Sequence, residues 1–327
     1  MQRKKLWSCI LSVMLCALTL TGCTGSVSDT DTDMTKKSIV CTTFPSYDWT
    51  RAILGAHLEE FELTLLLDKG GDIHSYQPTA KNIATIASAD LFVYVGGESD
   101  EWVAEVLRNT GNREMLVVNL MEALGGAVKE EEAVEGMREH HHGEAVEEAE
   151  YDEHVWLSLK NAQILTHVLS DNIKQLDETN SEDYAANEEA YVEQLKALDK
   201  EYADAVNTSD QTTLLFGDRF PFRYLTDDYG LDYYAAFTGC STETDASFET
   251  ITFLSGKMDE LGLSAILTIE NSDRRIAEVI KQNTRDKDQE ILTLNSLQSV
   301  TAKDINNGFT YLKAMQENLE ILKKVLH

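Results

Sequence analysis

The sequence predicts an α/β protein of two βα-repeating lobes, each with a mostly parallel sheet, joined by one long rigid helix, with a ligand cleft between the lobes. The basis is an alternation of short apolar runs with amphipathic segments, which occurs in two separate parts of the chain. A long helical pattern lies between those parts. The expected boundaries are an N-terminal lobe over residues 38–180, a linker helix over 181–206 and a C-terminal lobe over 207–327.

The N-terminal segment is expected to direct and tether the protein, not to fold with it. Basic residues at positions 3–5 precede an apolar run over 6–20, which is too short and wrongly flanked for a membrane-spanning helix and is typical of a signal peptide. The run ends at Leu-Thr-Gly-Cys, which looks like a bacterial lipobox, so we expect cleavage after residue 22 and lipidation of Cys23. A generic secretory signal would leave the position of this cysteine unexplained. Residues 23–37 then form a flexible tether, and the protein lies on the extracytoplasmic face of the cell membrane, held by its lipid anchor.

The composition favours cations as partners. The chain has 57 acidic and 28 basic residues and a formal net charge of -29, which becomes -32 when the three basic residues of the signal are removed. Nucleic acid and anionic lipid surfaces are poor partners for such a body. After processing, only Cys41 and Cys240 would remain as thiols, so the fold must be held by its core and not by a disulfide scaffold.

The first lobe contains four apolar runs that are too short for buried helices. Runs such as LFVYV are apolar at every position, which is typical of strands covered on both faces of a parallel sheet. The expected strands are 38–43, 61–67, 90–95 and 115–119, with helices between them at 49–54, 79–87 and 100–108, where apolar residues recur on one face.

A helical pattern runs from residue 159 to about 206 and is expected to break at residues 180–181. In the second piece, apolar and aromatic residues recur three or four positions apart, so a helix of more than twenty residues is expected. No heptad is sustained along it. We interpret this helix as a rigid connector between the lobes.

The second lobe repeats the pattern of the first without repeating its sequence. The expected strands are 212–216, 232–237, 264–269 and 290–294, and the expected helices are 247–261, 273–281 and a closing helix at 307–326. The chain contains no Gly-rich phosphate loop, nucleophile elbow or HExxH helix, so the sequence does not predict an enzyme.

Two histidines are candidate ligands: His74 lies seven residues past the end of the second expected strand, where ligands of α/β folds bind, and His154 follows the acidic loop and precedes the apolar residues 155–157. His74 lies in GGDIHSYQP and His154 in DEHVWL, each beside acidic residues that could orient an imidazole on a metal ion. A further group of three, at His140, His141 and His142, lies in an acidic loop over residues 128–151. This loop cannot build a core, and it offers many donors to a divalent cation, although a merely solvated acidic loop has the same composition.

Four motifs in order resemble the metal-specific solute-binding lipoproteins of bacterial ABC importers, the zinc and manganese group. They are TTFPSYDWTRAILG, GGDIHSYQPTAKNIATIASADLFVYVGG, DEHVWLSL and GFTYLKAMQENLEILKKVL, and together with the lipobox they span nearly all of the mature chain. The resemblance implies two lobes bridged by a long helix, with one cation held between them and handed to an ABC permease in the membrane. We expect the protein to be a monomer. His74 and His154 match the two ligands that the family's N-terminal lobe supplies.

The C-terminal lobe departs from the family's pattern. The position of the family's third ligand falls on Arg219, which stays protonated and cannot coordinate a cation, and Asn295 stands where relatives often have Asp. Other donors near the expected cleft are Asp218, Glu270, Glu243, Cys41 and Cys240. For the carboxylates the alternative role is pairing with a nearby arginine, and for the thiols it is that of a small buried apolar side chain.

Zinc is the expected cargo, because imidazole and thiolate donors favour Zn²⁺ over Mn²⁺, which prefers oxygen. Manganese is the alternative cargo. The His-rich loop would bind cations at low affinity and pass them to the cleft. A second alternative is the same fold with a changed ligand, such as an organic solute or a chelated metal gripped by Arg219. A metallohydrolase that uses Glu270 or Asp218 fits less well, because no nucleophile or oxyanion donor accompanies them. A surface-anchored protein could also serve in cell adhesion, for which the sequence carries no signal.

Overall fold

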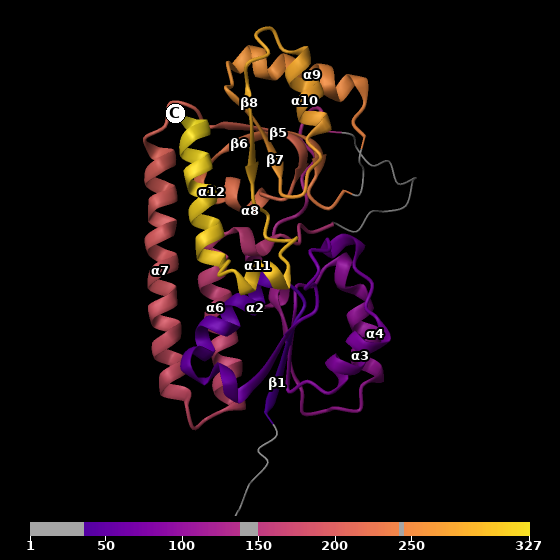
Figure 1. The fold of residues 1–327 in the computed structure, drawn as a ribbon, viewed down its shortest axis with the longest axis vertical. Helices are drawn as coiled ribbons and strands as arrows, with labels where there is room; N and C mark the ends of the chain where they lie inside the picture. The colour runs from indigo at the N-terminus through magenta and orange to yellow at the C-terminus, as the bar shows by residue number, and fades with distance from the viewer. Residues whose placement is uncertain (1–35, 138–149, 242–244) are drawn as a thin grey trace, which may run out of the picture. The chain divides into compact units, whose positions relative to one another are not determined.

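Two four-stranded parallel sheets organise the protein, as a computed structural model of residues 36–137, 150–241 and 245–327 shows (Figure 1). The first sheet has the order β2-β1-β3-β4, with β1 Lys37–Cys41, β2 Phe61–Leu65, β3 Leu91–Tyr94 and β4 Leu116–Asn119. The second has the order β6-β5-β7-β8, with β5 Thr213–Phe220, β6 Asp232–Thr238, β7 Ala265–Ile269 and β8 Glu290–Leu294. The predicted fold class is therefore confirmed, and each predicted strand is present.

The N-terminal lobe surrounds its sheet with α2 Phe44–Leu54, α3 Ala80–Ala87, α4 Glu101–Asn109 and the short α5 Leu120–Leu124. Helix α2 begins five residues before the expected start, because Pro45 occupies its first turn, where the missing N–H costs nothing. Helix α3 begins where expected, since Thr79 and Asn82 form a capping box. The five residues of α5 are too few to show a helical period, so the sequence did not predict this helix.

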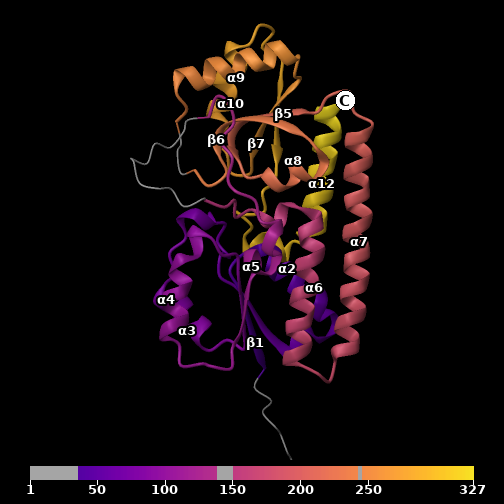
Figure 2. The same cartoon turned by 180° about the vertical axis from the view of Figure 1, so that it is seen from behind.

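Helix α6 Leu159–Leu176, at the end of the N-terminal lobe, is followed by the long helix α7 Ser181–Asn207, with the expected break before Ser181. The 27 residues of α7 extend for about 40 Å at 1.5 Å per residue. Helix α7 contacts α2 and α6 of the first lobe as well as α8 and α12 of the second, and both views show it running beside α6 and α12 (Figures 1 and 2). A single rigid element therefore contacts both lobes.

The C-terminal lobe contains α8 Arg223–Tyr229, α9 Phe248–Leu261, α10 Arg275–Asn283, α11 Ala302–Asn306 and α12 Tyr311–Leu326. Strand β5 continues four residues beyond the expected end, past an irregularity between Phe216 and Arg219. Gly217 lies at this irregularity because α10 passes very close, and a Cβ there would be 2.6 Å from Cα of Ala277. The added length carries Asp218 and Arg219 to the carboxyl edge of the sheet, where the lobes meet.

Hydrogen bonds from the C-terminal lobe fix one segment of the N-terminal lobe. The indole N–H of Trp156 donates to the carbonyl of Ser296 (2.8 Å), and the hydroxyl of Tyr311 donates to the carbonyl of Trp156 (2.6 Å). The hydroxyl of Tyr224 donates to the carbonyl of Asp152 (2.8 Å). All of these groups are buried, so the segment that carries His154 is held at Asp152, before the histidine, and at Trp156, after it.

Residues 1–35, including the expected signal peptide and Cys23, lie outside the described residues, as do His140, His141, His142 and Glu243. None of the helices that the described residues form is both long and apolar enough to cross a bilayer.

Candidate metal centre

His74 lies in the short 3-10 helix Ile73–Ser75, in the loop after β2. The Asp72 side chain caps this turn by accepting the N–H of His74 (3.0 Å). On the ring, Nδ1 is 2.9 Å from Oγ of Ser99 and 3.4 Å from Oε2 of Glu153. The side chain is 5% exposed. These contacts fix the ring through Nδ1 and leave Nε2 available to a ligand.

Ser99 is a supporting residue that the sequence did not indicate. It lies between β3 and α4, and its N–H donates to Oε1 of Glu153 (2.8 Å). Gly97, at φ +78°, lets this carboxylate approach, because a Cβ there would lie 2.4 Å from Oε1 of Glu153. The Gly-Gly pair after a buried strand was the available signal, since positive φ and close approach both favour glycine.

His154 is fully buried, and Asp152 orients it. Oδ1 of Asp152 accepts the backbone N–H of His154 (2.8 Å) and lies 2.9 Å from its Nδ1. Burial opposes protonation of the ring, but the nearby carboxylates, with Asp152 foremost, outweigh this effect and raise the pKa of His154 above its usual value. A carboxylate accepts hydrogen bonds, so it holds the proton on Nδ1 and leaves the Nε2 lone pair free.

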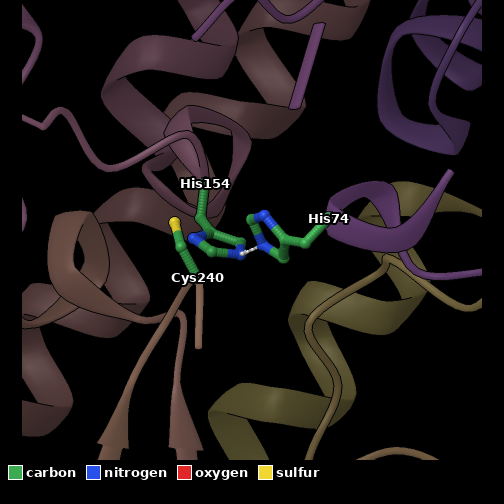
Figure 3. Close-up of side chains that lie close together, drawn as sticks. All are labelled: His74, His154 and Cys240. Carbon is green, nitrogen blue, oxygen red and sulfur yellow. Dashed lines mark hydrogen bonds between the residues drawn. The ribbon is translucent and has the colours of Figure 1, made fainter. Parts of the chain in front are cut away.

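The two imidazoles face one another across the lobe's edge, with Nε2 of His74 3.1 Å from Nε2 of His154 (Figure 3). Nδ1 of His154 faces the carboxylate of Asp152, whereas Nδ1 of His74 lies against the Ser99 hydroxyl, which can donate or accept. One proton can therefore be shared between the two Nε2 atoms, and a cation can take its place. Two nitrogens at 2.0–2.1 Å from one tetrahedral zinc ion lie about 3.3 Å apart. The observed separation fits a shared metal ion with little movement.

Cys240 brings a third donor from the other lobe, and its side chain lies beside the ring of His154 (Figure 3). The donor atoms of His74, His154 and Cys240 all lie within 4.8 Å of one another. Gly239 permits this approach, because a Cβ there would lie 3.1 Å from the ring of His154. Glu131 accepts the N–H of Cys240 (3.0 Å) and so holds the turn.

The Cys240 thiol would be protonated in the absence of a cation. Burial, assisted by the negative charges of Asp152 and Glu131, raises the pKa of Cys240 well above its usual value. A divalent cation reverses this balance, because it binds the thiolate and displaces the proton. Two imidazoles and one thiol are a donor set that suits zinc and leaves a fourth position for another donor.

The other donors considered in the C-terminal lobe lie outside this group of three. Glu270 accepts the N–H groups of Ser296 (2.6 Å), Gln298 (3.2 Å) and Ser299 (3.3 Å), and the hydroxyl of Ser296 (2.7 Å). It therefore folds the loop after β8. Within the same loop, Oδ1 of Asn295 accepts the N–H of Leu297 (2.8 Å).

Asp218 and Arg219 lie beside the donor group at the end of β5. Oδ1 of Asp218 accepts the N–H of Arg219 (2.8 Å), while its buried Oδ2 has no hydrogen-bond partner within the described part of the chain. The Arg219 guanidinium pairs with Asp72 of the other lobe (2.5 Å). Arg219 therefore binds a carboxylate of the protein itself, where the sequence had also allowed a carboxylate of a bound solute. Burial opposes ionisation of Asp72, but the charge of Arg219 outweighs it and keeps the pKa of Asp72 below its usual value.

Cys41 has the alternative role that the sequence allowed. It is fully buried in β1, its sulfur is 3.8 Å from the hydroxyl of Thr50, and burial raises its pKa to about 12. It is not one of the grouped donors.

An acidic cavity leads to the donor group. It has a volume of about 440 Å³ and is lined by Glu98, Glu101, Glu131, Glu150 and Glu153, with Ser99, Tyr151, His74 and Cys240. Among the residues that the structure describes, neither lysine nor arginine lines this cavity. Burial and then the neighbouring glutamates raise the pKa of Glu98, so these carboxylates lie close enough to repel. A cation entering the cavity would relieve that repulsion.

A second cavity, of about 500 Å³, is lined by residues of both lobes and shares His74 with the first. It is bordered by the carboxyl edge of the second sheet and includes Asp72, Asp218, Arg219 and Arg275. His74 therefore lines both an acidic cavity and one of mixed charge.

Comparisons with known proteins find relatives over nearly the whole chain. The family model of ZnuA, described as zinc-uptake complex component A, periplasmic, matches residues 39–325. The zinc-binding lipoprotein AdcA of Streptococcus pneumoniae is 31% identical over 320 residues, which cover 96% of this chain and 60% of AdcA. This chain thus spans about 60% of the length of that relative. The high-affinity zinc uptake system protein ZnuA of Bacillus subtilis is 28% identical over 98% of both chains.

A solved structure shows the same fold. The Zn(II)-bound ZnuA-like domain of Streptococcus pneumoniae AdcA superposes with a TM-score of 0.69 at 28% identity, covering 89% of this chain and 99% of that domain. The family model extends over both lobes and includes the two facing histidines. The chain therefore belongs to the ZnuA family, the periplasmic component A of zinc-uptake complexes.

Proposed function

We propose that this protein captures Zn²⁺ with Nε2 of His74, Nε2 of His154 and Sγ of Cys240, and delivers it to an ABC permease. The observation that carries the proposal is the convergence of three zinc-type donors, two from one lobe and one from the other, within 4.8 Å. Each ring is oriented through Nδ1, that of His154 by the Asp152 carboxylate and that of His74 by the Ser99 hydroxyl, as metal-binding imidazoles are oriented by a partner at their other nitrogen. The acidic cavity gives a cation a path to two of these donors.

The relatives support zinc as the cargo and transport as the purpose. Their names describe a zinc-binding lipoprotein and a high-affinity zinc uptake protein. Anchoring through Cys23 on the extracytoplasmic face would keep the protein next to its permease. In this proposal it acts as a monomer, and the His-rich loop with His140, His141 and His142 collects cations at low affinity.

Element-resolved analysis of the purified protein tests the proposal. We expect one zinc ion per chain after dialysis against weak chelator, and no manganese, because a thiolate and two imidazoles disfavour the harder ion. Protein that retains no metal after loading with Zn²⁺, or that prefers Mn²⁺ when both are offered, would contradict the proposal.

Zinc affinity is expected to fall as the pH falls, in two stages. The pKa of Cys240 is raised, so near neutrality zinc must displace the thiol proton, and affinity changes about tenfold per pH unit for each proton displaced. The pKa of His154 is also raised, from an ordinary value of ~6.5. Below the raised value a second proton must leave, and the dependence becomes steeper. Competition titrations between about pH 5 and 8 check this; a flat profile would exclude thiol and imidazole ligation.

A further inference from the structure

The Arg219 guanidinium connects the two lobes next to the donor group. Nη2 lies 2.5 Å from Oδ2 of Asp72 in the N-terminal lobe, and Nη1 donates to the carbonyl of Ser241 in its own lobe (3.3 Å). The Arg219 and Asp72 side chains are 19% and 23% exposed, so water screens the pair only partly. The positively charged Arg219 side chain thus lies beside a cation-binding site but cannot coordinate the cation, so it must have a role other than ligation.

Each contact of the guanidinium leads to one metal donor. Oδ1 of Asp72 accepts the N–H of His74, so the carboxylate that binds Arg219 also caps the turn that carries this imidazole. Ser241 follows Cys240 directly in the chain. Arg219 therefore lies on a short chain of contacts from the His74 turn of one lobe to the Cys240 turn of the other.

We propose that Arg219 is a positioning residue of the zinc site, which holds the Cys240 turn and the His74 turn in register so that their donors meet on one ion. The inference rests on the proposed function. Because arginine stands where relatives have a ligand, no metal–residue bond at this position can hold the two lobes together. The Arg219–Asp72 ion pair holds them instead. Fixing the donors in advance reduces the ordering cost of binding and so raises affinity.

The geometry requires arginine and not merely positive charge. The guanidinium is planar and directs separate N–H groups to Asp72 and to Ser241, whereas a lysine ammonium is a single point charge on a flexible stem. The charge alone would repel Zn²⁺. Its benefit must therefore come from position, which predicts that removing the charge weakens zinc binding.

The test compares Arg219→Gln, Arg219→Lys and Asp72→Asn with Arg275→Gln as the matched control. Arg275 borders the same cavity but forms its ion pairs with Asp245 (2.9 Å) and Asp273 (3.8 Å). Asp72→Asn keeps an oxygen that can cap His74 but removes the charge. Zinc affinity is measured by chelator competition, and cobalt-loaded protein is measured by the sulfur-to-cobalt absorption that reports a Cys240–metal bond.

We expect Arg219→Gln to lower zinc affinity about 10- to 100-fold, as loss of an outer-shell partner does, and to weaken the sulfur-to-cobalt absorption. Arg219→Lys should recover part of both. Asp72→Asn should add little to Arg219→Gln, because the two residues act as one unit. Thermal unfolding of the metal-free variants shows whether each is folded.

Unchanged zinc affinity in Arg219→Gln, with tight binding by the wild type, would overturn the inference and leave the proposed function intact. Equal losses in Arg219→Gln and Arg275→Gln would also overturn it, because they would indicate a general disturbance of the cavity and not a specific role of Arg219. A wild-type protein that binds no zinc would instead overturn the proposed function. If Arg219→Gln does not fold, the Arg219→Lys variant provides the test. Unchanged zinc affinity and cobalt absorption in Arg219→Lys would refute the role of the planar guanidinium.

Discussion

Replacing His154 with alanine is expected to lower zinc affinity by more than about 100-fold, because even outer-shell partners of a metal site typically contribute 10- to 100-fold. His154 is fully buried, and its Nε2 is 3.1 Å from Nε2 of His74. Its loss would leave one imidazole and one thiol, too few donors for tight zinc binding. Chelator competition measures the change in affinity, and the zinc-induced rise in melting temperature should disappear with it.

His167→Ala is the matched control for this prediction. His167 is also a histidine of the N-terminal lobe, but its side chain is 62% exposed and pairs with Glu188, so zinc affinity should not change. His74→Ala guards against misfolding, because its ring lies nearer the surface and its loss should weaken binding in the same way. If both His154→Ala and His74→Ala bind zinc as the wild type does, the paired imidazoles are not the site.

The fold could be predicted largely from the sequence, since buried parallel strands leave continuous apolar runs that few other elements produce. Strands β6 and β8 begin at the predicted residues, Asp232 and Glu290. The helices that were missed, such as α5 and α11, have five residues each. A helix of that length is held by its caps and neighbours, so its own sequence shows no period.

The imidazole pair was foreseeable because both histidines lie in loops that follow strands or acidic residues and match a known motif. The role of Glu270 was not. It ends a strand at the expected cleft, as a ligand would, yet its carboxylate accepts three backbone N–H groups from the loop after β8. Sequence does not reveal in which direction a loop's N–H groups point, so such a carboxylate cannot be told from a free one.

Charge and position together explain why the site is suited to capture. His74 lines an acidic cavity that contains five glutamates, and it also lines the second cavity, which contains the Arg219–Asp72 ion pair. The field therefore attracts a cation from the acidic side, which raises the association rate at low ionic strength. The buried donors beyond the cavity then determine how strongly the cation is held.

Replacing Cys240 with serine is expected to abolish the sulfur-to-cobalt absorption of cobalt-loaded protein and to lower zinc affinity by at least about tenfold, because a neutral hydroxyl is a much weaker ligand than a thiolate. The size and place of the side chain would be nearly unchanged, so the paired imidazoles should remain in position. Zinc binding to the variant should also release one proton fewer near neutral pH, because the Cys240 thiol, whose pKa is raised, supplies that proton in the wild type. Absorption spectra and titrations at two pH values measure both effects.

Cys41→Ala is the matched control, because Cys41 is the other thiol of the described chain and lies in the core of β1. It should keep the cobalt absorption and the pH dependence of the wild type, even if its melting temperature falls slightly. If the sulfur-to-cobalt absorption persisted in Cys240→Ser, or were lost in Cys41→Ala, the metal–sulfur bond could not be assigned to Cys240. A Cys240→Ser variant with wild-type affinity and an unchanged pH slope would mean that the two imidazoles hold zinc without a sulfur ligand. The C-terminal lobe would then have to supply an oxygen donor, and Asp218, whose buried Oδ2 lacks a partner in the described residues, would be the first to replace.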